Sequence, residues 1–478
     1  MLFTSFNFII FFPAVISIYY LLPKKIRWEF LLLASYYFYI NINPAYALLL
    51  IGVTVTTYFF TNLFGKTESE KLRKWLFIAD IIITLAPLFF FKYYNFINQS
   101  IFDLLNYWGL KWPLPNIGLL LPIGISFYTF MALGYSIDVY NEDIKAEKNF
   151  GIVALFLSFF PIVLSGPIER SKNMFHQFKG KLEFNYQRTV KGLQLILWGY
   201  FMKLVVAERV AIYVSTIFGN YEFHSGISLL FATLLYPFQI YGDLGGYSLI
   251  AIGCANVLGV DIIANFRRPF LATSMSDFWR RWHMSLITWM TDYIYTPISF
   301  SLRKYKVWGI VFALMLTFLI SGIWHGAALI YIIWGTFQGI LLSIEAVTNR
   351  RKATLEKKFD LRKKAWYIAF SCILTYFLFS FSLLIAGAVD SIPDALNVIE
   401  RIFTNKQSLF VNRTTLFYMF IGIGLLFLSE LRDEFFPDKF KLFQNKNLYV
   451  RWGAYFSILF LILLIGVFNG GQFIYFKF

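Results

Sequence analysis

Two histidines in strongly apolar sequence are the residues best suited to chemistry in this chain. His325 lies near the centre of residues 307–344, a stretch that contains no Asp, Glu, Lys or Arg. His283 lies in an aromatic segment, one residue after Trp282. An ionisable side chain in such surroundings is costly and usually functional. A neutral imidazole could accept the proton of a hydroxyl group while the hydroxyl oxygen attacks a thioester.

For each of these histidines the alternative is a core residue whose ring is hydrogen-bonded to a carbonyl group. That alternative weighs more heavily for His283 than for His325. The other two histidines, His176 and His224, lie in polar loop sequence and are expected at the surface.

A third polar feature interrupts apolar sequence at residues 238–248. Asp243 lies between two predicted spans, with Gln239 one turn before it and Tyr241 between them, while Gly245 and Gly246 permit a broken helix and close backbone approach. A carboxylate at this depth is expected to face an arginine, a histidine ring nitrogen or a substrate hydroxyl. Gln239, Tyr241 and Asp243 are therefore candidate substrate-binding residues. The alternative is a polar tie between helices.

The segment around His283 is predicted to form one helix. Ser274 and Asp277 fit a capping box at its start, and Asp277 and Arg281 are spaced for an intrahelical ion pair, so that a structural role is expected for both. Such a helix would place Trp279, Trp282, His283 and Leu286 on one face.

Composition assigns the chain to membrane proteins. It has 478 residues, of which 58% are hydrophobic, 21% aromatic and 15% charged, whereas soluble domains carry about one quarter charged residues. The net charge of +16 comes from short basic clusters between apolar segments, which fits topology signals rather than nucleic-acid binding. Cys254 and Cys372 lie in apolar sequence and are expected to behave as small hydrophobes. No metal site or disulfide framework is predicted.

The predicted fold is all-α and polytopic, with about 11–14 membrane helices plus re-entrant and interfacial helices, in a single domain over residues 1–478. The expected spans are roughly 6–22, 28–41, 45–64, 75–95, 117–138, 150–165, 189–206, 226–242, 246–264, 307–324, 326–345, 366–388, 414–430 and 452–469. The first span is expected to be a membrane helix rather than a removable signal peptide. Residues 98–116 are expected to lie at the membrane interface.

Two segments have basic residues at both ends, so a single crossing does not fit them. Residues 150–165 are expected to be re-entrant, because Pro161 and the Ser165-Gly-Pro167 turn break any long helix there. Residues 307–344 are expected to form a hairpin with both ends in the cytoplasm. His325, between two glycines, would then lie near the turn of the hairpin.

These motifs together resemble the membrane-bound O-acyltransferases, and within them the bacterial branch that includes the alginate O-acetyltransferase membrane subunit. The resemblance covers most of the chain, with small departures at Gly245, where Ser is common, and at Leu249, where many relatives carry a second Asp. The segments that carry it are Ser165-Gly-Pro-Ile-Glu-Arg170, Gln239-Ile-Tyr-Gly-Asp-Leu-Gly-Gly-Tyr-Ser248, Phe278-Trp-Arg-Arg-Trp-His-Met-Ser-Leu286, Ile323-Trp-His-Gly-Ala327 and Phe473-Ile-Tyr-Phe-Lys-Phe478.

The resemblance implies a family core at about residues 117–345 around a central tunnel. It implies that His325 is the catalytic histidine, that His283 is the second family histidine, and that Gly166 and Pro167 form a structural turn. The residues that would wall the tunnel are Trp279, Trp282 and Trp324.

The resemblance also implies a reaction. An acyl group, with acetyl as the first candidate, would pass from acetyl-coenzyme A or an acyl carrier protein across the bacterial cytoplasmic membrane. An extracytoplasmic SGNH or serine esterase-like acetyltransferase partner would esterify a polysaccharide or cell-wall glycan. No tightly bound cofactor is implied; membrane lipid is the other expected partner.

Two other classes of function stay open at this point. A proton-coupled transporter or flippase would use His325, His283 and Asp243 as a relay or solute site. A structural subunit would only recruit a glycan-modifying enzyme, and His325 would then have no part in chemistry.

Overall fold

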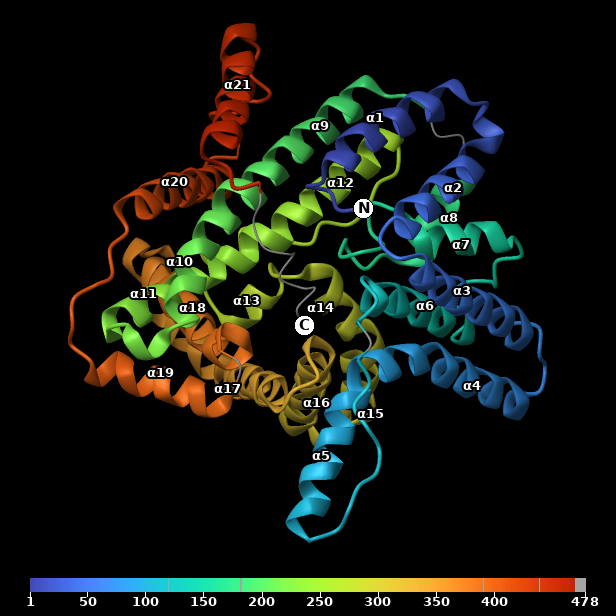
Figure 1. Cartoon of the computed structure of the whole chain (residues 1–478), viewed down its shortest axis with the longest axis horizontal. Coiled ribbons are helices and arrows are strands. Elements are labelled where there is room, and N and C mark those ends of the chain that lie inside the picture. The colour runs from blue at the N-terminus through green and yellow to red at the C-terminus, as the bar shows by residue number, and fades with distance from the viewer. Residues whose placement is uncertain (119, 181–182, 390, 438, 469–478) are drawn as a thin grey trace. The chain divides into compact units, whose positions relative to one another are not determined.

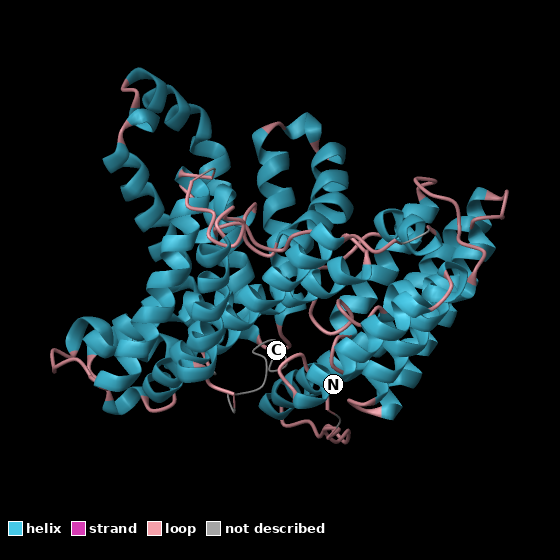
Figure 2. Cartoon of the chain, turned by 90° about the horizontal axis from the view of Figure 1, so that it is seen from above, coloured by secondary structure: helices cyan, strands magenta, loops and turns pink. Residues whose placement is uncertain are grey.

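The computed structural model describes residues 1–118, 120–180, 183–389, 391–437 and 439–468. Helices and loops account for all of these residues, and no strand occurs among them (Figure 2). The chain divides into two compact units, Met1–Leu193 with Ala251–Ile263 and Gln194–Ile250 with Ala264–Phe478. The family ending predicted at residues 473–478 lies outside the described residues, and a single domain over the whole chain stays a prediction.

The first unit consists of helices joined by short turns and by longer loops, such as those on either side of α7 (Figure 1). Its helices are α1 Phe6–Leu21, α2 Arg27–Ile40, α3 Pro44–Phe64, α4 Glu70–Leu88, α5 Tyr94–Tyr107, α6 Ile125–Tyr140, α7 Phe150–Ser158 and α8 Ser171–Lys179, with the short segments η1 Lys24–Ile26 and η2 Phe89–Tyr93. Helix α9, Tyr186–Tyr200, leaves this unit, and helix α12, Gly246–Leu258, returns to it.

The second unit holds both candidate histidines. Its helices are α10 Glu208–Phe218, α11 Gly226–Ile240, α13 Met275–Trp279, α14 Met284–Met290, α15 Thr296–Ser301, α16 Val307–His325, α17 Leu329–Lys358, α18 Ala365–Leu383, α19 Ile392–Thr404, α20 Arg413–Phe435 and α21 Leu448–Ile465. Between them lie the π-helical segments η3 Phe201–Ala207, η5 Tyr241–Gly245, η7 Thr291–Tyr295 and η10 Leu384–Ala388, and the 3₁₀ segments η4 Tyr221–Phe223, η6 Pro269–Leu271, η8 Arg303–Tyr305 and η9 Leu361–Lys363.

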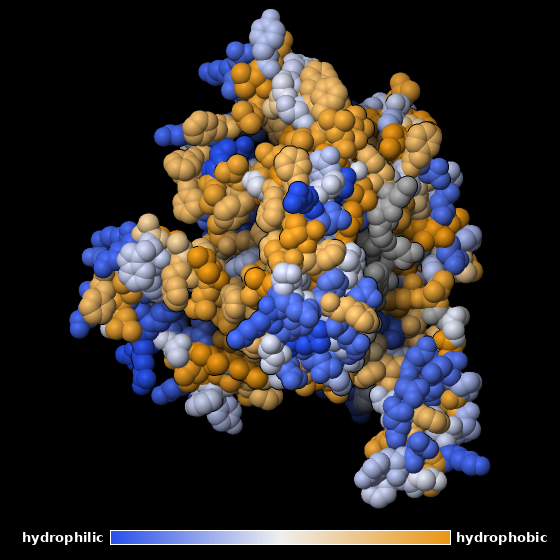
Figure 3. Space-filling model, turned by 60° about the vertical axis from the view of Figure 1, so that its left-hand side comes forward, coloured by the Kyte–Doolittle hydropathy of each residue, from blue (hydrophilic) through white to orange (hydrophobic). Residues whose placement is uncertain are grey.

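Eight helical segments among the described residues are long and apolar enough to cross a membrane, so the chain is an all-α, multi-pass membrane protein. Seven of them, all but Gly226–Leu258, are buried over less than half of their most apolar stretch. Their remaining side chains face outward, and Figure 3 shows apolar residues over much of one face of the surface between hydrophilic clusters. Helix α1 is apolar but has only 16 residues, so it is not one of these eight segments.

The predicted hairpin is present. Helices α16 and α17 pack along each other and are joined by residues 326–328. The backbones come together at two glycines: a Cβ atom on Gly322 would lie 2.4 Å from the Tyr331 carbonyl oxygen, and one on Gly335 would lie 2.3 Å from that of Phe318. Small residues allow such contact between membrane helices. His325 is the last residue of α16, directly before the turn.

Three other expectations meet different outcomes. Helix α7 has nine residues, about 13 Å, which is too short to cross a membrane and agrees with a re-entrant segment. The two spans predicted on either side of Asp243 are wrong as separate helices, since residues Gly226–Leu258 form one continuous run that contains the π-helical segment η5. Residues 98–107 continue the helical run Glu70–Tyr107, and their place at the membrane interface stays a prediction.

Candidate active site

His325 stands in a group of tryptophans at the tip of the hairpin. Its ring centroid lies 5.0 Å from that of Trp324 and 5.0 Å from that of Trp334, and both contacts are edge-on. Trp334 in turn contacts Trp279 at 6.0 Å. All three tryptophans are only 4% exposed, whereas His325 is partly exposed. The imidazole is therefore the accessible member of an otherwise buried aromatic cluster.

His283 contacts the same cluster through Trp324. Its ring lies 6.2 Å from Trp324, so Trp324 contacts both histidines. His283 is 1% exposed and also contacts Phe266 at 6.2 Å. Burial lowers the pKa of His283 to about 3, because the charged imidazolium loses its hydration. His283 is thus buried and held neutral, whereas His325 is partly exposed.

The single helix predicted through His283 is wrong. Helix α13 ends at Trp279, and His283 has a φ of 45° and a ψ of 48°, in the left-handed region, directly before α14. The side chain and carbonyl oxygen of buried Asn265 explain this conformation: they accept hydrogen bonds from the backbone N–H groups of Ser285, at 3.3 Å, and Met284, at 2.8 Å. These bonds fix the start of α14 and hold His283 in a non-helical backbone conformation. Backbone strain of this kind is concentrated at functional sites.

The two tryptophans of this segment face different surroundings. The Trp279 indole N–H donates to the side-chain Oε1 of Gln338 at 3.3 Å, which fixes the ring against α17. Trp282 stacks on Phe278 and lies 6.1 Å from the ring of Tyr241. Only Trp279 therefore contacts the cluster around His325 through Trp334. A role for these side chains in walling a tunnel stays a prediction.

Asp243 has a partner that the sequence did not predict. Lys203 Nζ lies 2.5 Å from Asp243 Oδ1 and 2.7 Å from Glu208 Oε1, and all three side chains are at least nine-tenths buried. The expected arginine or histidine partner is replaced by a lysine from η3, which packs against η5. Close approach requires Gly246, where a Cβ atom would lie 2.7 Å from the Gly199 carbonyl oxygen and 2.9 Å from the Lys203 amide nitrogen.

The other two candidate residues of the polar segment 238–248, Tyr241 and Gln239, differ in burial. The Tyr241 hydroxyl donates to Glu430 of α20, and its ring packs on Phe266 and Phe270. Tyr241 is thus a core residue of this unit, tied to a buried carboxylate. Gln239 is only partly buried. Substrate binding by Gln239, Tyr241 or Asp243 stays a prediction.

The expected ion pair is present, but only half of the capping box forms, because the Asp277 carboxylate accepts from the backbone N–H of Thr273 at 3.2 Å instead of from that of Ser274. Arg281 Nε lies 3.1 Å from Asp277 Oδ1, and the backbone N–H of Asp277 donates to Ser274 Oγ at 3.2 Å. Arg281 also reaches Glu434 of α20 at 3.0 Å. These contacts give Asp277 and Arg281 structural partners.

The Gly166-Pro167 turn belongs to the first unit and is buried there. A Cβ atom on Gly166 would lie 2.4 Å from Ile162 Cα, so the turn leaves room for glycine alone. Next to it, the Glu169 carboxylate accepts from the Asn173 amide at 2.9 Å and from the backbone N–H of Ile263. The turn therefore organises the loops of its own unit.

Sequence reasoning missed Lys203, Asn265 and Gln338. A signal existed for Lys203, which is the only charged residue among residues 189–207 apart from Lys191 near the beginning. Asn265 and Gln338 carry no such signal, because a single amide in mixed sequence predicts nothing about its partners.

Comparison with known proteins finds a family match that includes the residues of this site. Residues 148–387, which include both histidines, match the family model of the membrane-bound O-acyltransferases. The probable alginate O-acetylase AlgI of Pseudomonas aeruginosa is 36% identical over 348 residues, 72% of this chain and 66% of its own length. The peptidoglycan O-acetyltransferase of Helicobacter pylori is 33% identical over 72% of this chain and 68% of its own. The teichoic acid D-alanyltransferase of Streptococcus thermophilus is 28% identical over 63% and 71%.

Proposed function

The chain belongs to the membrane-bound O-acyltransferase family, a family of acyltransferases, and from that premise we propose that it moves an acetyl group from a cytoplasmic thioester toward an extracytoplasmic glycan. The observation that carries this proposal is the partly exposed ring of His325 at the tip of the α16–α17 hairpin, within an otherwise buried aromatic cluster. The product would be an O-acetylated polysaccharide or cell-wall glycan.

The proposed chemistry needs one base and one acid. A ring nitrogen of His325 accepts the proton of an acceptor hydroxyl while its oxygen forms a bond to the thioester carbonyl carbon. The carbon–sulfur bond then breaks, and the imidazolium returns the proton to the departing thiolate. The surrounding tryptophans exclude water, which otherwise hydrolyses the thioester. His283, being neutral and buried, positions Trp324 rather than exchanging protons.

Acetyl is proposed over other acyl groups on the basis of similarity. The relatives named as O-acetylases or O-acetyltransferases are 32–36% identical to this chain, whereas those named as D-alanyltransferases are 26–28% identical. The donor is acetyl-coenzyme A or an acetylated carrier protein. The acceptor hydroxyl belongs to the glycan or to an extracytoplasmic SGNH or serine esterase-like partner that completes the transfer.

The proposed location is the bacterial cytoplasmic membrane. Basic residues at both ends of the hairpin, Arg303 and Lys304 before it and Arg350 and Arg351 after it, favour the cytoplasm for both ends. A donor made in the cytoplasm would then meet His325 at the far end of the hairpin from its basic flanks.

The test is acetyl transfer by the purified protein in liposomes, with radiolabelled acetyl-coenzyme A and, in parallel, a radiolabelled acetyl carrier protein. His325→Ala is expected to lower thioester turnover by about 10²–10⁴-fold, the usual contribution of a general base. His176→Ala, at an exposed histidine of the first unit, serves as the matched control.

The outcomes separate the competing functions. Wild-type turnover in well-folded His325→Ala contradicts the enzymatic role of this residue. Solute uptake driven by a proton gradient, without thioester turnover, would indicate a transporter instead.

A further inference from the structure

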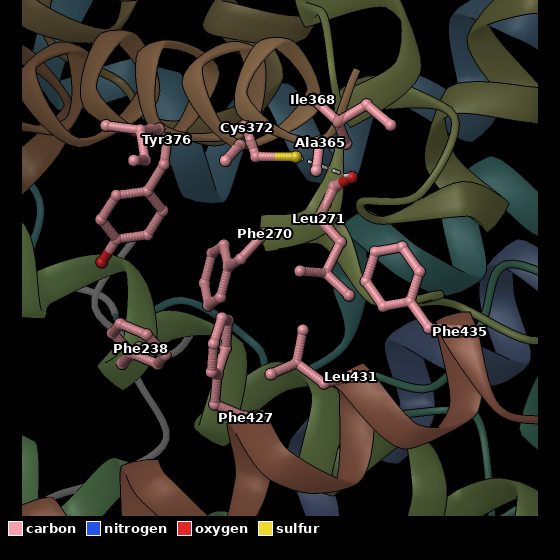
Figure 4. Close-up of a pocket in the computed structure, with 12 residues that line it drawn as sticks. Phe238, Phe270, Leu271, Ala365, Ile368, Cys372, Tyr376, Phe427, Leu431 and Phe435 are labelled. Atoms are coloured by element: carbon pink, nitrogen blue, oxygen red, sulfur yellow. Dashed lines mark hydrogen bonds between the residues drawn. The ribbon is translucent and has the colours of Figure 1, made fainter. Parts of the chain in front are cut away.

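An apolar groove opens between α18 and α20, on the second unit (Figure 4). Its volume is about 500 Å³. Phe270 and Leu271 form its floor, Tyr376 and Cys372 come from α18, and Phe427 comes from α20. Both helices are candidate membrane spans, so the groove between them lies in the membrane-spanning part of the unit.

The polar groups in the groove are already occupied by the protein. The Cys372 thiol donates to the Leu271 carbonyl oxygen at 3.3 Å, and the Tyr376 hydroxyl donates to that of Leu234. No charged side chain is among the residues that line the groove. A polar ligand would find nothing to pair with, whereas hydrocarbon loses nothing on entering.

The length of the groove corresponds to one leaflet of a membrane. On α18 it runs from Ala365 to Tyr376, about 16 Å at 1.5 Å per residue, and on α20 from Phe427 to Phe435, about 12 Å. Half of a hydrocarbon core about 30 Å thick is about 15 Å. The groove therefore extends from one membrane surface to about the middle of the bilayer.

Its outer end carries exposed basic and aromatic side chains. The two carboxylates beside it are paired within the protein, Asp433 with Arg432 and Glu434 with Arg268 and Arg281. Exposed Lys363 and Lys364 directly precede Ala365, and Trp366 is 62% exposed beside them. On the α20 side, Lys439 lies over the ring of Phe436. Exposed tryptophan and lysine mark the level of lipid headgroups, and lysines there attract anionic lipid.

We propose that this groove binds one acyl chain of an anionic glycerophospholipid, whose phosphate is held at the basic end by Lys364. The chain packs on Phe270, whose ring contacts Tyr241 at 5.2 Å and Trp282 at 6.2 Å. Bound lipid thereby supports the packing of Phe270 against Tyr241 and Trp282, the residue directly before His283. This binding site is independent of the proposed acyl transfer, because occupancy is measured without turnover.

The first experiment uses the unaltered protein in lipid nanodiscs with phosphatidylglycerol that carries a diazirine in the middle of one acyl chain. After illumination, cross-links are expected mainly on residues 368–376 and 427–431, and excess unlabelled phosphatidylglycerol is expected to suppress them at least fivefold. Cross-links spread evenly over all exposed helix faces, or insensitive to competitor, would overturn the proposal.

The second experiment counts phospholipids retained by purified protein in native mass spectrometry. Ala369→Trp fills the groove from α18 and is expected to lower retention at least fivefold, whereas Leu374→Trp, at an exposed residue of α18 outside the groove, retains wild-type occupancy. Lys364→Gln is expected to remove the preference for phosphatidylglycerol over phosphatidylcholine, and Lys71→Gln, at an exposed lysine of the first unit, is the control. Equal retention by the two tryptophan variants contradicts the proposal.

Discussion

Lys203 and Asp243 form a buried ion pair where two π-helical segments meet, with Nζ 2.5 Å from Oδ1. Glu208 is the second carboxylate on the same lysine, at 2.7 Å. A π-helical turn inserts one extra residue into a helix and often marks a functional position. In this chain η3 and η5 together bring one cation and two carboxylates into contact within the second unit.

Replacement of Lys203 by Met is predicted to destabilise the protein by about 3–5 kcal/mol, because it leaves two buried carboxylates without their cation. The measurement is the thermal unfolding midpoint of protein purified in detergent. The double variant Lys203→Met/Asp243→Asn is expected to recover part of the loss, since one of the two charges is then removed. Lys304→Met, at an exposed lysine, is the matched control. If Lys203→Met unfolds at the same temperature as the control, the pair has no structural role.

Gly246→Ala is predicted to be destabilising by about 1–3 kcal/mol, because the new methyl group meets backbone atoms of α9 and η3 that cannot move independently. Gly453→Ala in α21, where nothing lies within 4 Å of the added Cβ, is expected to be neutral or stabilising by up to about 1 kcal/mol. Unfolding midpoints of the two variants measured side by side provide the test. Similar behaviour of both would mean that the contact of α12 with α9 and η3 relaxes freely.

The sequence predicts some of these structural features correctly and others wrongly, for physical reasons. Hydropathy and basic flanks identify the α16–α17 hairpin and place His325 at its tip, because span length and charge act over a few adjacent residues. The prediction of one helix through His283 is wrong, because hydrogen bonds from Asn265 interrupt that helix. No local sequence pattern encodes these hydrogen bonds. The partner of Asp243 is predicted wrongly for the same reason. Its pairing with a lysine of another helix depends on close packing at glycines, and no local sequence pattern encodes that packing.

The pKa of His283 predicts a pH dependence of stability. The turn that holds His283 lies outside the membrane-spanning helices, and burial lowers its pKa from 6.5 to about 3 in the folded protein. Between these values the unfolded chain binds more protons than the folded one, so stability is complete above pH 6.5 and falls as the pH is lowered. Between pH 7 and pH 5 the expected loss is about 2 kcal/mol.

His283→Asn is the variant that tests this dependence, because asparagine tolerates left-handed backbone and does not titrate. Chemical denaturation of both proteins at pH 7 and pH 5 is the measurement. The wild type is expected to lose about 2 kcal/mol more than the variant over this interval. A parallel loss in both would mean that His283 is protonated in the folded state.

The hairpin predicts which positions share one side of the membrane. In a chain with Cys254→Ala and Cys372→Ala, single cysteines introduced as Lys304→Cys and Lys357→Cys are expected to react with a membrane-impermeant maleimide from the cytoplasmic side alone. Helix α16 has 19 residues, about 28 Å, nearly the thickness of the hydrocarbon core. Ala327→Cys, in the turn beside His325, is therefore expected to be protected from the cytoplasmic reagent. Labelling of Lys304→Cys and Lys357→Cys from opposite sides would contradict the hairpin, and full cytoplasmic labelling of Ala327→Cys would place His325 too near the donor side to meet an extracytoplasmic acceptor.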